Sequence, residues 1–144
     1  MSISDVLRGK GRQVVRVRTT DTIQIAVRKL ADHRIGAVVA EDAWMKPVGI
    51  FSERDFVNAV AEYGAEALTF RVERLMSSPV VTCSLSDTVD TALAAMTMAK
   101  IRHLPVQEGG QLIGIVSIGD LVKHRLDEKA LEANVLLDIA RFHV

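Results

Sequence analysis

Residues 49–55 read Gly-Ile-Phe-Ser-Glu-Arg-Asp, and residues 114–120 read Gly-Ile-Val-Ser-Ile-Gly-Asp. Each copy follows an apolar run typical of a strand and precedes a run typical of an amphipathic helix. Serine at such a helix start is a common cap. The same place also favours a phosphate oxygen, and a carboxylate one turn later is suited to the hydroxyls of a ribose. The repetition weakens the capping interpretation without removing it.

The duplication extends well beyond these two stretches. Asp21 and Ile35 are matched 66 positions later by Asp87 and Ile101, and the serine–aspartate stretches lie 65 positions apart. Each copy predicts the order strand–helix–strand–strand–helix, in which the first helix supplies the crossover that parallel strands require. The sequence therefore predicts an α/β fold of two β-α-β-β-α half-domains with pseudo-two-fold symmetry, followed by a C-terminal helical extension.

The pattern along the chain predicts where the elements lie. Strands are expected over residues 13–17, 35–40, 48–51, 80–83, 103–106 and 112–116. Thr20-Asp21 and Ser86-Asp87 are expected to cap helices, and the helix over residues 52–63 is expected to turn Phe56, Val57 and Val60 inward. The predicted division is an N-terminal arm over 1–13, a first repeat over 14–64, a connector over 65–79, a second repeat over 80–125 and a C-terminal helix over 126–144.

Apolar residues recur at helical spacing beyond the second repeat: Leu126, Ala130, Ala133, Leu137 and Ala140. A helix of this length carries an apolar stripe that one small domain does not cover. The pattern predicts an arm that packs against a partner, most simply a second copy of the chain. A partly frayed tail is the alternative.

Composition narrows the classes of function. The 144 residues are 49% hydrophobic and 4% aromatic, with 18 basic and 18 acidic side chains. Such a balance favours neither nucleic acid nor a membrane surface as partner, although the basic residues in 8–12, with Arg16 and Arg18, keep nucleic-acid binding as an alternative. The single cysteine, Cys83, excludes an internal disulfide and is expected in the core. With no leader and no run of roughly 18 apolar residues, a cytoplasmic protein is expected.

Neither a metal site nor an active site is expected. His33, His103, His124 and His143 show no metal-ligand spacing with one another or with Cys83. A hydrolase triad is conceivable on paper from Ser117, His103 and Asp120, but the chain carries no Gly-x-Ser-x-Gly elbow. Trp44 is interpreted either as an exposed anchor for a partner or as a cover for the edge of the core.

The duplicated order, the two Gly-h-h-Ser-x-x-Asp stretches (h, hydrophobic) and residues 101–106, Ile-Arg-His-Leu-Pro-Val, together resemble a pair of cystathionine-β-synthase-type (CBS) domains, also called a Bateman module. The resemblance covers roughly residues 3–125 and is greatest to small stand-alone bacterial members with a helical tail. It implies two pseudo-symmetric clefts for adenosine-containing ligands such as AMP, ADP, ATP, NAD(H) or S-adenosylmethionine. It also implies that two pairs stack into a homodimer.

The same resemblance implies roles for individual residues. Asp55 and Asp120 would hold the two ribose rings, and Ser52 and Ser117 would approach the phosphates. Further phosphate contacts are expected from Arg54, Arg102, His103, Lys10 and Arg12. Adenine contacts are expected from Val15, Ile35, Gly36, Ala37 and Val38 beside Asp120, and from Val81, Ile101, Arg102 and Pro105 beside Asp55. Because Arg54 precedes Asp55 whereas Gly119 precedes Asp120, the two sites are predicted to be unequal.

The sequence thus predicts a regulatory module without catalytic cofactor, whose nucleotide shifts the population of two conformations and whose protein target is unidentified. Two alternatives remain: a ligand-independent scaffold acting through the C-terminal helix, and a nucleic-acid-binding protein.

Overall fold

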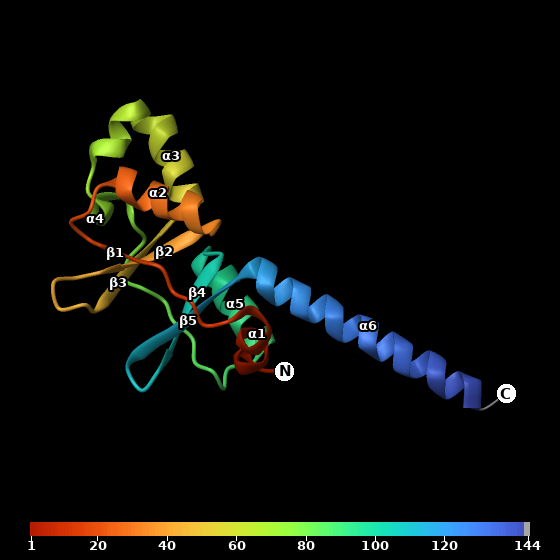
Figure 1. The fold of residues 1–144 in the computed structure, drawn as a ribbon. Coiled ribbons are helices and arrows are strands. Elements are labelled where there is room, and N and C mark those ends of the chain that lie inside the picture. The colour runs from red at the N-terminus through yellow and green to blue at the C-terminus, as the bar shows by residue number, and fades with distance from the viewer. Residues whose placement is uncertain (143–144) are drawn as a thin grey trace.

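The first half-domain is a three-stranded sheet with two helices, and the computed structural model describes residues 1–142 (Figure 1). β1 (Arg16–Arg18) pairs in parallel with β2 (Ala37–Glu41), which pairs antiparallel with β3 (Pro47–Ser52). α2 (Ile23–His33) makes the crossover between the parallel strands, and α3 (Glu53–Tyr63) follows β3 directly. The predicted β-α-β-β-α order is confirmed.

The second half-domain repeats this plan with a weaker first strand. β4 (His103–Glu108) and β5 (Gln111–Ser117) form an antiparallel pair, and α5 (Val89–Ala99) precedes them. The strand expected over 80–83 is reduced to one parallel bridge, in which the Cys83 N–H donates to the Pro105 carbonyl and the Gln107 N–H donates to the Cys83 carbonyl, at 3.0 and 2.9 Å. Pro79 has no N–H to extend the ladder.

The helix caps lie one residue later than predicted. Thr22 and Thr88 cap α2 and α5 through their hydroxyls, which accept from backbone N–H groups three residues on. The aspartates expected to cap instead close the preceding turns: Asp21 accepts the Arg18 N–H and Asp87 accepts the Ser84 N–H, each at 2.8 Å. Short acidic side chains often stabilise turns in this way.

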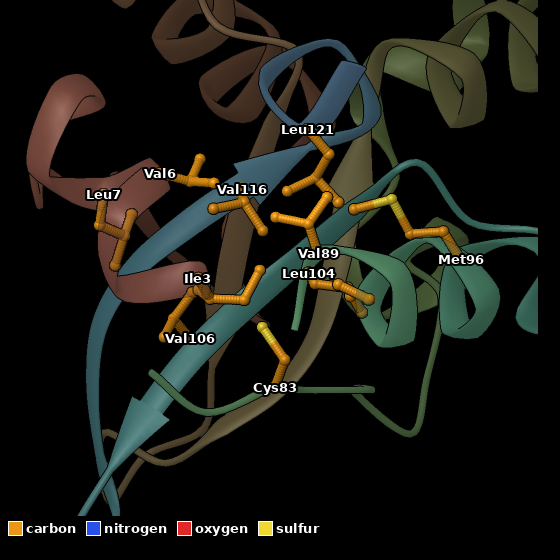
Figure 2. Close-up of a cluster of buried hydrophobic side chains, with 11 residues drawn as sticks. Ile3, Val6, Leu7, Cys83, Val89, Met96, Leu104, Val106, Val116 and Leu121 are labelled. Atoms are coloured by element: carbon orange, nitrogen blue, oxygen red, sulfur yellow. The ribbon is translucent and has the colours of Figure 1, made fainter. Parts of the chain in front are cut away.

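The helix that precedes the first half-domain packs against the second half-domain, and the helix that precedes the second packs against the first. α1 (Ile3–Lys10) buries Ile3, Val6 and Leu7 against the second half, as Figure 2 shows. In the first half, α4 (Val72–Leu75) buries Val72 among the residues of that core. Three of the first ten residues therefore belong to a core whose other members lie about 80 or more residues further along the chain, so this part of the predicted N-terminal arm is packed.

The two cores are built mainly from aliphatic side chains. The first consists of Val17, Ile23, Ala26, Leu30, Val38, Ala40, Phe51 and Val72. The second, drawn in Figure 2, consists of Ile3, Val6, Leu7, Cys83, Val89, Ala92, Met96, Leu104, Val106, Val116 and Leu121. Cys83 therefore has the core position that the repeat predicts.

The connector and the C-terminal helix complete the chain. α3 ends at Gly64, whose φ of 69° favours glycine, and the 3-10 helix η1 (Gly64–Thr69) leads to α4. α6 (Ile118–Phe142) begins against β5, buries Leu121 and then projects away from both half-domains (Figure 1). Residues 129–142 of it are exposed throughout. Among residues 1–142, no helix combines the length and apolar content needed to cross a membrane.

Candidate functional site

A cleft of about 630 Å³ lies where the end of β3 and the start of α3 face the second half-domain. Both halves line it. The first half contributes Gly36, Ile50, Ser52, Glu53, Arg54, Asp55 and Asn58. The second half and the segment leading to it contribute Ser77, Pro79, Val80, Val81, Met96, Thr97, Lys100, Ile101, Arg102, His103 and Ile118. A cavity of this size suits a small organic ligand.

Asp55 is held in this cleft by a reciprocal cap with Ser52. The Ser52 hydroxyl accepts the Asp55 N–H at 3.3 Å, while the Ser52 N–H and hydroxyl donate to Oδ2 of Asp55 at 2.9 and 3.1 Å. Both hydrogen bonds that the carboxylate accepts therefore go to Oδ2, and Oδ1 remains for the cleft. Burial raises the pKa of Asp55, and the Ser52 hydrogen bonds and the Arg54 charge offset only part of that rise.

Three positive side chains line the same cleft as this carboxylate. Arg54, Lys100 and Arg102 line the cleft, against the acidic side chains of Glu53 and Asp55. Lys100 was missed by the sequence reasoning. It ends α5 in the left-handed conformation, with φ of 55°, and the signal was available: a basic residue directly before the predicted contact residues 101–103.

The second serine–aspartate pair has the same cap but a different partner. The Ser117 N–H donates to Oδ2 of Asp120 at 2.8 Å, and the Asp120 N–H donates to the Ser117 hydroxyl at 3.1 Å. Lys10 donates through Nζ to the same Oδ2 at 2.6 Å and to the Ile115 carbonyl at 2.8 Å. Burial alone would raise the pKa of Asp120, but the hydrogen bonds from Lys10 and Ser117 and the Lys10 charge leave it lowered.

His103 lies at the contact between the halves. A Cβ built on Gly36 would approach Nε2 of His103 to 3.0 Å, so a larger residue at position 36 would require the imidazole to shift. Burial lowers the pKa of His103, and Lys10 and Arg102 lower it further while Asp120 opposes them. The lowered pKa favours the neutral form of the imidazole at pH 7.

The two helix starts are joined to the opposite strand of their own half by equivalent bonds. The Glu53 N–H donates to the Gly36 carbonyl at 3.0 Å, and the Ile118 N–H donates to the Arg102 carbonyl at 2.8 Å. The N–H group of the first residue of each helix is therefore already bonded within the protein.

The structure brings some of the predicted contact residues together and separates others. Ser52, Arg54, Asp55, Gly36, Val81, Ile101, Arg102 and His103 all line the same cleft. Lys10, Ser117 and Asp120 form the second group described above. Ala37, Val38 and Pro105 are buried within the sheets, so their side chains are not available to a ligand. Val15 and Ile35 pack against the first core, and Arg12 is exposed on the segment after α1.

The hydrogen bonds of Ser117 and Asp120 differ from those of the triad that is conceivable on paper. Ser117 and Asp120 direct their hydrogen bonds to each other and to Lys10 rather than to His103. Within residues 1–142, no group of three His, Cys, Asp or Glu side chains is arranged to hold a metal ion, and His143 lies outside the described residues.

Comparison with known proteins identifies the family. A family model described as CBS domain matches the chain twice, over residues 3–62 and 72–127. The CBS domain-containing protein CBSX3, mitochondrial, of Arabidopsis thaliana is 31% identical over 151 residues, which cover 93% of this chain and 71% of that protein.

Two solved structures extend the comparison. The crystal structure of the CBS-domain containing protein ATU1752 from Agrobacterium tumefaciens shares 46% identity at a TM-score of 0.82, covering 86% of this chain and 92% of that one. The CBS domain protein PAE2072 from Pyrobaculum aerophilum, solved in complex with AMP, shares 31% identity at a TM-score of 0.73, covering 83% and 89%. The chain therefore belongs to the CBS-domain family, and its two matched segments form a tandem pair of CBS domains.

Proposed function

We propose that this protein is a regulatory module that binds an adenosine-containing nucleotide, of the AMP, ADP, ATP or NAD(H) type, in the cleft beside Asp55. One observation carries the proposal: the Asp55 carboxylate, which accepts its two hydrogen bonds at Oδ2, lines a cleft of about 630 Å³ together with three cationic side chains. The AMP complex of the Pyrobaculum aerophilum relative supports this class of ligand.

The cleft suggests a role for each part of such a ligand. Asp55 would accept the hydroxyls of the ribose, while Arg54, Lys100 and Arg102 would pair with the phosphates. The apolar side chains of Val81 and Ile101 would form the walls against adenine. A purine ring between aliphatic side chains buries apolar area without requiring an aromatic residue.

The proposed output is conformational. Since the cleft is lined from both half-domains, a ligand in it contacts both and favours the arrangement that it fits best. The receiver of that change is an unidentified protein target, and the proposed setting is the cytoplasm. We propose regulation rather than catalysis, because the hydroxyls and carboxylates at both helix starts are bound in reciprocal caps.

Calorimetry with AMP, ATP, NADH and S-adenosylmethionine tests the proposal. At least one of them should bind, and Asp55→Ala should weaken that binding about 10- to 100-fold, because it removes charge-assisted hydrogen bonds to the ribose. Asp32→Ala is the matched control, since Asp32 is an exposed carboxylate on α2 that lies outside the cleft. Unchanged affinity in Asp55→Ala would refute the ribose assignment.

A second candidate function rests on α6. Its exposed apolar side chains include Leu131, Leu136 and Leu137, and they suit a homodimer that acts as a ligand-independent scaffold. The scaffold function would be supported if the protein forms a dimer through α6 and none of the four ligands produces heat or a thermal shift. Nucleic acid is the least favoured partner, because Arg8, Lys10 and Arg16 are paired with Asp5, Asp120 and Glu41 of the same chain.

A further inference from the structure

The turn between β2 and β3 presents two large apolar side chains to solvent. Trp44 is the single tryptophan of the chain, and Trp44 and Met45 are 84% and 79% exposed. Figure 1 shows this turn at the end of the β2–β3 hairpin that is remote from α3. Tryptophan and methionine are enriched where proteins contact one another, so the turn is a candidate contact surface.

The turn is held in one conformation by Asp42. Oδ1 of Asp42 accepts the N–H groups of Trp44 and Lys46, each at 2.9 Å. The backbone of Asp42 adds two bonds: its carbonyl accepts the Met45 N–H at 3.0 Å, and its N–H donates to the Lys46 carbonyl at 2.9 Å. Side chains on such a preorganised turn lose little further freedom when they bind.

The equivalent turn of the second half-domain carries no side chains. Gly109 and Gly110 connect β4 to β5 there, with φ of 57° and 77°. In the first half, Met45 has φ of 60°. A left-handed conformation is sterically costly for a residue other than glycine. The first half thus keeps an exposed apolar side chain at a position where glycine would be more stable, and strain of this kind is common at functional sites.

A groove between α2 and α3 complements this turn in shape and charge. Its volume is about 340 Å³, and its apolar lining consists of Val27, Leu30, Ala31, Ile35, Phe56 and Val57. The charged residues that line it are Arg34 and Glu53. The turn carries one charge of each sign as well, because Asp42 and Lys46 flank Trp44 and Met45. Opposite charges around an apolar contact fix its orientation.

A hairpin cannot reach the groove of its own half-domain. β2 and β3 meet the turn at Glu41 and Pro47, whereas Ile35 and Glu53 of the groove lie just beyond the opposite ends of the two strands. A strand of five residues separates the two places by about 17 Å. The groove that receives the turn must therefore belong to another molecule.

We propose that the turn of one copy of this chain docks in the α2–α3 groove of a second copy. Trp44 enters the groove with Met45 beside it, and Asp42 and Lys46 lie against Arg34 and Glu53 of the second copy. A contact based on two side chains is much smaller than the roughly 800 Å² per partner of a stable interface. The association is therefore weak and depends on protein concentration.

The fluorescence of Trp44 in the full-length protein tests this contact directly. From about 1 µM to 1 mM, the range expected of a small interface, the emission should move to shorter wavelength and quenching by acrylamide should decrease. Because Trp44 lies on the turn, its emission does not report packing of α6. Emission that stays constant with concentration would overturn the proposal. So would a shift that appears only with phosphatidylserine vesicles, which would assign the turn to a lipid surface.

Variants on both sides of the contact locate it. Val57→Arg should abolish the concentration-dependent shift, because Val57 is 64% exposed in the groove. Val122→Arg is the matched control: Val122 lies 65 positions later, at the equivalent place in the repeat, is also exposed, and does not line the groove. An unchanged shift in Val57→Arg, or its loss in both variants, would contradict docking in the α2–α3 groove.

Two changes in and around the turn separate binding from structure. Met45→Gly should raise the thermal midpoint, because glycine accepts the left-handed conformation, and should weaken the association about tenfold. A merely structural role would give the first effect without the second. Lys46→Glu should also weaken the association, and Glu53→Lys added to it should restore the shift. Failure of the double variant to recover would refute the proposed pairing of Lys46 with Glu53.

Discussion

Asp55 and Asp120 stand at matching positions, third residue of α3 and third residue of α6, yet their pKa values are shifted in opposite directions. Both form the same cap with a serine, and both are partly buried. The difference comes from the cation: Lys10 donates to Asp120 at 2.6 Å, whereas Asp55 has Arg54 only as a nearby charge. A duplicated motif has thus acquired two electrostatic environments.

We predict that neutralising Asp120 lowers stability at pH 7, whereas neutralising Asp55 does not. A raised pKa means that Asp55 contributes stability below its unfolded value of 3.8, which is lost as pH rises through the folded value. Asp55→Asn should therefore leave the free energy of unfolding at pH 7 unchanged or raise it. Asp120, with a lowered pKa, contributes stability above 3.8, which is lost as pH falls through its folded value. Asp120→Asn should cost about 1 kcal/mol at pH 7, because the ion pair is partly exposed.

Urea denaturation at pH 7 and at pH 3 measures both effects. The destabilisation of Asp120→Asn should shrink at the lower pH, where the carboxylate of the unmodified protein begins to take up a proton. Asp32→Asn, on the exposed face of α2, should show no such pH dependence. Equal destabilisation by Asp55→Asn and Asp120→Asn at pH 7 would contradict the opposite pKa shifts of the two carboxylates.

Replacing each of two glycines with alanine is expected to change the free energy of unfolding in opposite directions. A Cβ on Gly49 would meet Sδ of Met76 at 2.6 Å and the Ser77 carbonyl oxygen at 2.9 Å, and the latter is backbone that cannot move aside. Gly49→Ala should therefore lower the free energy of unfolding by about 1–3 kcal/mol. A Cβ on Gly119 meets nothing closer than the Ser117 hydroxyl at 3.6 Å, and the residue is helical. Gly119→Ala should raise the free energy of unfolding by about 0.5–1 kcal/mol. Thermal denaturation of the two variants tests whether Gly49→Ala lowers the midpoint and Gly119→Ala raises it.

Cys83 should be almost inert in the native protein. Burial in the second core, with a smaller contribution from Asp87, raises the pKa of its thiol from 9.0 to about 11. At pH 8 about one thiol in a thousand is then ionised, and only the thiolate reacts with disulfide reagents. We expect slow modification at pH 8 that accelerates about tenfold per pH unit, and immediate modification in denaturant. Rapid reaction of the folded protein at pH 8 would show that the second core opens readily.

The sequence predicted the elements that local patterns encode, and it missed what depends on packing at long range. Ser52 and Ser117 cap their helices where the repeated motif places them. Nothing local to residues 3–10 indicates that α1 completes the second core, since its partners lie about 80 residues away. The position of Lys10 on Asp120 follows from that packing.

Exposure was also hard to predict from spacing alone. Val57 and Val60 were expected to face the core, but Val57 is 64% exposed and Ala59 is the buried residue of α3. Apolar spacing defines a stripe on a helix, and tertiary contacts decide which edge of the stripe is covered. Trp44 is 84% exposed, which excludes the interpretation that it covers the core.

The C-terminal helix supports the last prediction, which concerns assembly. The predicted stripe through Leu126 and Leu137 is exposed, and a second stripe of Leu131, Val135, Ile139 and Phe142 runs along another face of α6. Leu131 and Leu137 are 65% and 63% exposed. Apolar side chains left in water on two faces favour packing of α6 against a second copy of the chain.

Leu137→Glu should therefore weaken the proposed homodimer without unfolding the half-domains. Each buried leucine contributes about 1.5–3 kcal/mol, and a symmetric interface loses two of them. The dimer dissociation constant should rise roughly 100- to 10,000-fold, measured by sedimentation equilibrium, while the thermal midpoint extrapolated to monomer changes little. Asn134→Glu adds the same charge to the polar face of α6 and should leave the dimer intact. Persistence of a tight dimer in Leu137→Glu, and again after removal of residues 130–144, would locate the interface on the half-domains instead of α6.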